Sequence, residues 1–335
     1  MKIILSGYHN PKFLTVTEYL ERAISKLGHE LFVCEDRRHI ISGRIRKKVA
    51  LLNDIDLWYI NRQIRSCIKR PGAALAIITG GHRIATSTIR KINRSGIVSI
   101  LWTIDPPWDF QPIIRAAPFY KHIFCQGTEA VDILKENGIR SAQWIPMACD
   151  PEIHVPVQLS EEEKTKYGSD IVFVGSYYEN RADLLRNIVD FNLGIWGPGW
   201  EILEKSDPLR KCVKGGGVIP EVFNRIYSAA KISIVCHFQD GKNLCYQASP
   251  KVFESLASRS FVLVDRQKDV FSLFRDGTHL VGFDGPNDLR KKLIYYLDHP
   301  RDRLAIADQG YRCVLENHTY VHRIKKVLSA VTGSQ

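Results

Sequence analysis

Short apolar segments alternate with longer helical segments along most of the chain, and no other feature constrains the fold as strongly. Segments such as KIILSG (2–7) and IVSILWTID (97–105) are rich in branched apolar residues, and each precedes a segment of helical character. Strands separated by helices pair in parallel, because each helix returns the chain to the same edge of the sheet. The sequence therefore predicts an α/β fold. We expect the other strands at 30–36, 74–81, 122–127, 141–146, 170–176, 193–197, 231–238, 260–266 and 279–283.

One segment interrupts this alternation. CDPEIHVPVQLSEEEKTKYGSD contains prolines and many charges and has no sustained period, which is typical of a linker. A chain of 335 residues is long enough for two domains that each have their own core. We therefore expect two Rossmann-like, doubly wound parallel-sheet domains at 1–150 and 170–315, joined by a linker at 151–169. Ligands of such domains bind at the carboxyl ends of the strands and in the cleft between domains.

Composition narrows the class of protein. No stretch approaches the roughly 18 apolar residues of a membrane span, and the N-terminal run in MKIILSGYHN is too short for a signal peptide. The eight cysteines are scattered without a CxxC pair, which favours buried free thiols in a reducing compartment over a zinc site. We therefore expect a cytoplasmic protein.

The net charge of +11 is concentrated in the first 150 residues, which hold 22 lysines and arginines against 13 aspartates and glutamates. RRHIISGRIRKK (37–48) and RQIRSCIKR (62–70) carry much of this charge. The excess favours an acidic partner: a nucleic acid, an anionic membrane surface or a phosphorylated substrate. Solvated helix faces and loops would give the same pattern, so both interpretations stay open.

Two turns that follow expected strands could approach an anion. VGSYYENR places Gly175 and Ser176 in a turn before a helix, where backbone N–H groups and the helix N-terminus attract negative charge, and Arg181 adds a guanidinium. SGYHNPKF forms a corresponding turn in which Gly7 allows close backbone approach. Neither turn is a GxGxxG fingerprint or a P-loop, so a classical dinucleotide site and a P-loop NTPase are not supported.

The segment LWTIDPPWDF offers a candidate catalytic carboxylate. Asp105 ends an apolar strand, and the two prolines after it prevent immediate helix formation. A carboxylate held there between aromatic residues is suited to act as a general base or to accept a substrate hydroxyl. A turn aspartate that caps local N–H groups is the alternative.

SPKVFESLASRSFVLVDR places Lys251 and Glu254 one helical turn apart, just before an apolar strand. Packing requires neither charge there, although a solvated helix face is the alternative. In order with VGSYYENR, IWGPGW, IYSAAKISIVCHF, LVGFDGPNDLRKKLIYYLDHP and ENHTYVHRIKKVL, this segment resembles the GT-B glycosyltransferases, specifically the CgeB-like, spore-maturation branch of the family-4-like group. The resemblance covers nearly the whole chain and is strongest from Asp170 to Val327.

The resemblance implies roles for several residues. In such enzymes the residue matching Glu254 holds the ribose hydroxyls of a nucleotide-sugar donor, and the one matching Lys251 faces the diphosphate. Asp105 lies where related enzymes carry an acidic residue or a histidine near the reacting sugar. The first domain would bind the acceptor and the second the donor, with the C-terminal helix at 316–335 crossing back to the first domain. The candidate donor-binding residues are Gly7, Gly175, Ser176, Arg181, His237, Ser249, Lys251 and Glu254.

The sequence also departs from this family. The glutamate that usually precedes the retained one by eight residues is Tyr246, which leaves the sugar and the stereochemistry of transfer open. The usual small residue and glycine after the helix are replaced by Ser258 and Arg259, and we expect Arg259 at the surface. A packed histidine is the alternative for His237. His318 and His322 are expected to be structural.

The resemblance therefore predicts a hexosyl- or pentosyltransferase that moves a sugar from a nucleotide-diphosphate donor, a UDP-sugar first, to a hydroxyl. No DxD pair stands out, so we expect no metal and no bound cofactor. The acceptor stays open among a hydroxymethylated base in DNA, a lipid-linked or surface glycan at an anionic membrane, and a protein. Association with nucleic acid or with the periphery of a membrane would follow from the first two. The alternative function is a non-catalytic GT-B-like module that binds nucleotide or nucleic acid.

Overall fold

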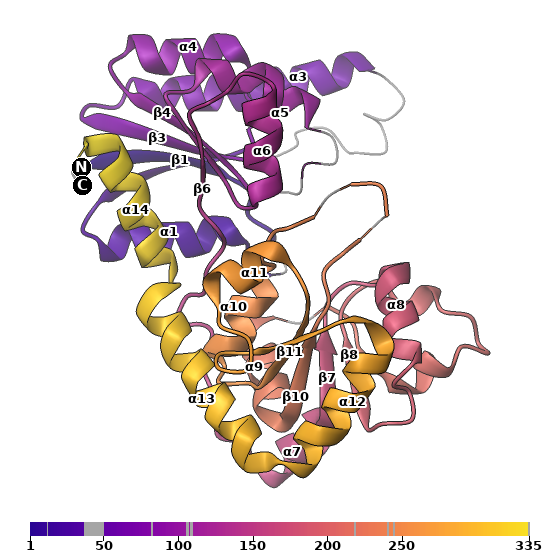
Figure 1. Ribbon diagram of the computed structural model, residues 1–335. Coiled ribbons are helices and arrows are strands. Elements are labelled where there is room, and N and C mark those ends of the chain that lie inside the picture. The colour runs from indigo at the N-terminus through magenta and orange to yellow at the C-terminus, as the bar shows by residue number, and fades with distance from the viewer. Residues whose placement is uncertain are drawn as a thin grey trace. The chain divides into compact units, whose positions relative to one another are not determined.

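The computed structural model consists of two compact units, each built around a parallel sheet (Figure 1). It describes residues 1–11, 13–36, 50–81, 83–104, 107, 110–217, 219–239, 241–243 and 245–333. Unit 1 comprises Met1–Pro146 and Tyr320–Gln335, and unit 2 comprises Met147–Thr319. Each sheet has six strands, with helices between consecutive strands. The α/β fold predicted from the alternation of apolar and helical segments is confirmed.

The sheet of unit 1 has the strand order β2-β1-β3-β4-β5-β6, and its neighbouring strands are parallel. The chain moves from β1 to one side to form β2 and then to the other side to form β3, so the strand order reverses beside β1. The strands are β1 (Lys2–Gly7), β2 (Glu30–Glu35), β3 (Ala73–Thr79), β4 (Val98–Thr103), β5 (His122–Cys125) and β6 (Ala142–Trp144). The helices are α1 (Val16–Lys26), α3 (Ala50–Ile68), α4 (Thr86–Arg94), α5 (Gln111–Ala116), η1 (Ala117–Phe119) and α6 (Thr128–Glu136).

The C-terminal helix α14 (Tyr320–Thr332) packs against α1 in unit 1, as the yellow and indigo ribbons of Figure 1 show. The ring of Tyr320 stacks on that of Tyr19 with centroids 5.3 Å apart. Arg323 Nε donates a hydrogen bond of 2.9 Å to the carbonyl of Pro146. The end of the chain is thereby anchored to the unit in which the chain begins.

Unit 2 has the strand order β12-β11-β10-β7-β8-β9, again with parallel neighbours. The order reverses between β7 and β10, so the carboxyl ends of these two central strands lie side by side. The strands are β7 (Ser169–Val174), β8 (Leu193–Trp196), β9 (Val213–Gly215), β10 (Ala230–Val235), β11 (Val262–Asp265) and β12 (Val281–Phe283). The helices are α7 (Glu161–Tyr167), α8 (Glu179–Arg186), η2 (Trp200–Ile202), η3 (Pro208–Cys212), α9 (Pro220–Ala229), α10 (Pro250–Ala257), α11 (Lys268–Leu273), α12 (Gly285–Asp298) and α13 (Pro300–Asn317).

The segment 151–169, for which the sequence predicts a linker, contains helix α7 and lies within unit 2. The helix begins with a capping box, in which Ser160 accepts from the Glu163 N–H and the Glu163 carboxylate accepts from the Ser160 N–H. Arg225 on α9 donates to Glu163 at 2.7 Å. Capping and this ion pair stabilise a helix that has no apolar periodicity of its own.

Some classes of site are absent from the part of the chain that the structure describes. No helix there combines the length and the hydropathy needed to cross a membrane. Nor do three or more histidine, cysteine, aspartate or glutamate side chains gather there as metal ligands would. The cysteines are free thiols, most of them buried.

Candidate functional site

The loop that follows β7 is held by a backbone contact with β8 and by the side chain of Trp200 in η2. The N–H of Gly175 donates to the carbonyl of Trp196 at 2.8 Å, and the carbonyl of Gly175 accepts from the indole N–H of Trp200 at 2.9 Å. A Cβ on Gly175 would lie 3.0 Å from the ring of Phe173 and 3.4 Å from Arg181 Nη1. The turn predicted from VGSYYENR therefore lies at the carboxyl end of β7, directly before α8, and its close packing favours glycine.

Arg181 connects this loop with the end of β10. Its Nε donates to the carbonyl of Cys236 at 3.0 Å, and its Nη1 donates to the carbonyl of Ser176 at 3.0 Å. The guanidinium also lies 4.9 Å from the centre of the Tyr178 ring. Burial lowers the pKa of Arg181 from its usual value. The side chain lies at the predicted edge of the sheet, where two of its donors hold the backbone of the loop.

His237 follows β10 and is buried, with 2% of its surface exposed. Its Nδ1 lies 2.6 Å from Asp265 Oδ1 at the end of β11, and its Nε2 accepts from the Ser249 N–H at 2.9 Å. Because Nε2 is an acceptor, Nδ1 carries the proton and donates to Asp265. Burial would raise the pKa of Asp265, but the contact with His237 holds it below its usual range. His237 therefore positions the start of α10 through Ser249.

Helix α10 begins at this anchored position. The Ser249 side chain caps it by accepting from the Lys251 N–H at 3.3 Å, and Pro250 occupies the first turn. Lys251 Nζ donates to Glu254 Oε2 at 2.7 Å, because a spacing of three residues places both side chains on one helix face. The Lys251 side chain is 36% exposed and that of Glu254 only 9%. The helix therefore presents an accessible ammonium group beside a buried carboxylate.

The environment of Glu254 keeps this carboxylate charged. Burial would raise its pKa, but Lys251 and His154 hold the pKa below its usual value. His154 Nε2 lies 3.9 Å from Glu254 Oε1. An ionised carboxylate accepts hydrogen bonds and does not donate them, so Glu254 is suited to hold hydroxyl groups of a ligand.

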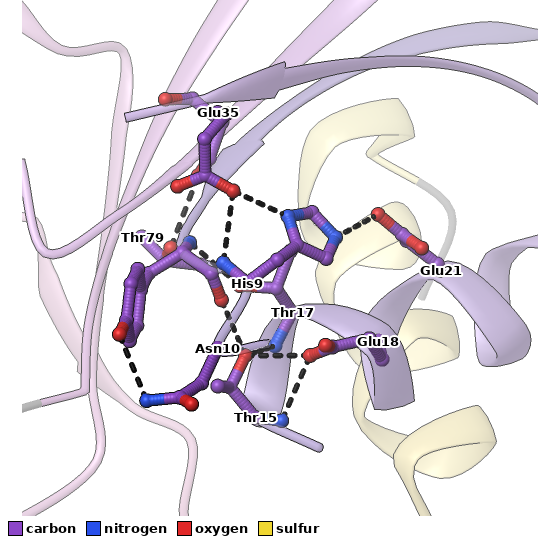
Figure 2. A network of polar contacts seen from close by, with 10 residues as sticks. His9, Asn10, Thr15, Thr17, Glu18, Glu21, Glu35 and Thr79 are labelled. Atoms are coloured by element: carbon purple, nitrogen blue, oxygen red, sulfur yellow. Dashed lines mark hydrogen bonds and ion pairs between the residues drawn. The ribbon is translucent and has the colours of Figure 1, made fainter. Parts of the chain in front are cut away.

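In unit 1, Gly7 lies where β1 meets the start of α1. A Cβ on Gly7 would lie 2.3 Å from Thr17 Oγ1, which also accepts from the Tyr8 N–H at 2.9 Å. The next residue, His9, lies between two carboxylates, with Nδ1 2.7 Å from Glu35 and Nε2 2.8 Å from Glu21 (Figure 2). Burial would lower the pKa of His9, but these two hydrogen bonds raise it. Gly7 thus allows α1 to pack closely against the β1 turn, beside the hydrogen bonds that join His9 to Glu21 and Glu35.

Further expectations concern Asp105, the basic stretch 37–48, Tyr246 and Arg259. Asp105 and the basic stretch 37–48 lie outside the described residues. Tyr246 accepts a backbone hydrogen bond from Asp269 at 3.0 Å, and Lys268 lies 4.9 Å from the centre of its ring. Arg259 has a left-handed backbone (φ 56°), and its exposed side chain pairs with Asp308 at 2.5 Å.

The structure also identifies two residues that the sequence analysis does not select. Asp265 ends β11, so the strand-end rule that selects Asp105 would have found it. His154 has no sequence signal, because it lies in the segment predicted to be a linker and approaches Glu254 only in the folded unit.

Part of the chain matches a known family. Residues 181–329 match a family model described as "Glycosyl transferase-like". Spore protein CgeB of Bacillus subtilis (strain 168) is 20% identical over 253 residues, which cover 72% of this chain and 77% of that protein.

The fold matches solved structures along the whole chain. Sucrose-phosphate synthase from Thermosynechococcus elongatus has a TM-score of 0.72 at 11% identity and covers 100% of both chains. HepE from Anabaena, solved in complex with UDP-glucose, has a TM-score of 0.69 at 8% identity and covers 99% of this chain and 100% of its own. At these identities the likeness shows a shared fold.

Proposed function

We propose that the chain is a CgeB-like GT-B glycosyltransferase that transfers a sugar from a nucleoside-diphosphate-sugar donor to a hydroxyl acceptor, a proposal supported by the family match, the similarity to CgeB and the shared fold. The resemblance predicted from the sequence is confirmed. The observation that carries the proposal is the charged pair at the start of α10, in which Lys251 lies 2.7 Å from the buried Glu254.

The two charged groups of this pair are complementary to the ribose and to the diphosphate of a nucleoside diphosphate. The Glu254 carboxylate can accept from both ribose hydroxyls, and the Lys251 ammonium can offset the negative charge of the diphosphate. The charge on the diphosphate grows as the bond to the sugar breaks, so an ammonium placed there stabilises the transition state more than the bound donor. The turn at Gly175 and Ser176, directly before α8, adds backbone N–H groups and a helix N-terminus.

We propose a uridine diphosphate sugar as the donor, since the similar fold of HepE was solved with UDP-glucose. Transfer would proceed without a bound metal, because Lys251 supplies positive charge at the diphosphate, whereas Asp54 and Asp56, which form a DxD sequence, lie within helix α3 of unit 1. The excess of basic residues in the first 150 residues favours an acceptor that carries negative charge, such as modified DNA or an anionic glycan.

Replacing Glu254 with glutamine tests the donor site. We expect the variant to bind UDP about 30-fold more weakly, because a neutral amide replaces charge-assisted hydrogen bonds to the ribose. Isothermal titration calorimetry with UDP, GDP, ADP and TDP measures the loss and identifies the base. The matched control is Glu204→Gln, which changes an exposed glutamate of the same unit. Equal UDP affinity in wild type and Glu254→Gln would rule out this site.

Replacing Asp105 with asparagine distinguishes a glycosyltransferase from a non-catalytic binding module. Because Asp105 is the proposed general base, we expect Asp105→Asn to bind UDP with unchanged affinity and to turn over about 100-fold more slowly. Turnover is measured as the release of UDP when wild type hydrolyses the UDP-sugar. This assay requires no knowledge of the acceptor. Unchanged turnover would remove Asp105 from the catalytic role. Nucleotide binding by wild type with no turnover of any sugar conjugate would favour the non-catalytic module.

A further inference from the structure

Two cysteines of unit 1 that are distant in the sequence place their thiols in contact. Cys34 lies on β2 and Cys67 in the last turn of α3, and their Sγ atoms are 2.7 Å apart. Both side chains belong to the core cluster of the unit, with 4% and 5% of their surfaces exposed. The proposed donor site in unit 2 uses neither thiol. Two thiols in direct contact are the reactants from which a disulfide forms.

The packing of α3 on β2 determines this contact. Burial alternates along the strand, so Phe32 and Cys34 face the core while Val33 between them is exposed. Ile64 and Cys67, three residues apart, lie on the buried face of α3. The strand β2 forms one edge of the sheet, and α3 ends one residue after Cys67. A small reactant can reach the pair there, because sheet edges and helix ends open at the lowest free energy.

The electrostatic environment distinguishes the nucleophile from its partner. The hydrogen bond with Cys34 lowers the pKa of Cys67 to about 7, and the positive charge of Arg70 adds to this effect while burial opposes it. The same contact raises the pKa of Cys34. Elsewhere in unit 1, burial raises the pKa of Cys125 to about 12. At neutral pH, Cys67 therefore carries thiolate character, Cys34 is the S–H donor, and Cys125 is an unreactive thiol.

We propose that Cys34 and Cys67 form a modification site, a dithiol that hydrogen peroxide oxidises reversibly to a disulfide joining β2 to α3. The Cys67 thiolate attacks one peroxide oxygen and the O–O bond breaks, which gives a sulfenic acid and a hydroxide that takes up a proton. The sulfur of Cys34 then attacks Cys67 Sγ, and the departing hydroxide leaves with the Cys34 proton as water. The two thiols together lose two electrons and two protons, and the peroxide is reduced to two molecules of water.

The disulfide is expected to stabilise unit 1. It would restrict the unfolded chain between residues 34 and 67, while the folded chain already holds the two sulfurs together. Because α3 also packs against β1 and α4, the bond would tie the edge strand to a helix that contacts the interior of the unit. The proposal does not depend on the transferase activity, since the donor-binding residues Lys251 and Glu254 belong to unit 2.

The test treats the full chain, under native conditions, with an equimolar amount of hydrogen peroxide. We expect mass spectrometry of the intact chain to show the loss of two hydrogen atoms, and a non-reduced digest to contain a peptide pair linked through Cys34 and Cys67. The cross-link should raise the melting temperature by about 5 °C, and dithiothreitol should reverse both changes. Cys125→Ser is the matched control, because it removes another buried thiol of unit 1 and should keep the cross-link.

Single variants test the order of the two steps. In Cys34→Ser the sulfenic acid at Cys67 lacks its partner, so dimedone should label Cys67, whereas Cys34 should stay unlabelled in Cys67→Ser. Labelling of Cys34 instead would overturn the assignment of the nucleophile. Wild type that keeps both thiols after peroxide treatment, or that forms the cross-link only in urea, would overturn the proposal as a whole. These two results come from wild type, so they decide the question even if a variant does not fold.

Discussion

Replacement of Lys251 by methionine should lower kcat/KM for transfer from the UDP-sugar donor about 1,000-fold. The Lys251 ammonium is the charged group that α10 leaves accessible beside the buried Glu254, with 36% of its side chain exposed. Methionine keeps an unbranched apolar side chain next to the Phe223 ring, which lies 5.1 Å from Nζ, but it removes the charge. The leaving diphosphate would then develop its charge without a counterion, so kcat should fall more than donor affinity.

The matched control for this prediction is Lys231→Met. Lys231 is also ion-paired in unit 2, at 2.7 Å from Asp170, and its side chain is 54% exposed. An exposed pair of this kind contributes little, so the control should keep wild-type kinetics and stability. Lys251→Arg keeps the charge with a different shape and should lose less activity than Lys251→Met. A kcat/KM for Lys251→Met within threefold of wild type would contradict the role at the diphosphate.

The order of most strands could be predicted from the sequence because apolar β-branched runs are buried on both faces of a parallel sheet. The segment 2–7, for example, coincides with β1, and the segment 231–238 overlaps all of β10 except its first residue, Ala230. The sequence does not predict β9, since Val213–Gly215 has only three residues and a single large apolar side chain and becomes a strand only by pairing with β8. Nor does it predict α7, whose stability comes from its cap and its contact with α9. Both β9 and α7 are elements that form through tertiary contacts rather than through local sequence preference.

The candidate site was predictable where local spacing determines geometry. A spacing of three residues in a helix places Lys251 and Glu254 on one face, as the structure shows. Spacing does not reveal which polar side-chain groups are already hydrogen-bonded within the protein. Two donors of Arg181 bind backbone carbonyls, and both ring nitrogens of His237 are engaged within unit 2. The approach of His154 to Glu254 joins residues 100 positions apart and follows from the fold alone.

Replacement of Gly197 by alanine should reduce the free energy of unfolding of unit 2 by about 4 kcal/mol. Gly197 follows β8 with a φ of 142°, a conformation that favours glycine. A Cβ there would lie 2.0 Å from the carbonyl oxygen of Gly175. That carbonyl is backbone, held by the indole of Trp200, and cannot rotate away. The alanine must therefore displace the loop after β7, the same loop that is proposed to approach the donor phosphates.

Urea unfolding followed by tryptophan fluorescence measures this effect, because Trp196 and Trp200 flank the substituted position. Gly216→Ala is the matched control, since a Cβ at Gly216 would meet nothing within 4 Å. Equal unfolding midpoints in the two variants would contradict the close approach of the β7 and β8 loops. A lower midpoint together with weaker UDP binding in Gly197→Ala is expected, because the contact that stabilises the end of the sheet also fixes the backbone of the proposed phosphate loop.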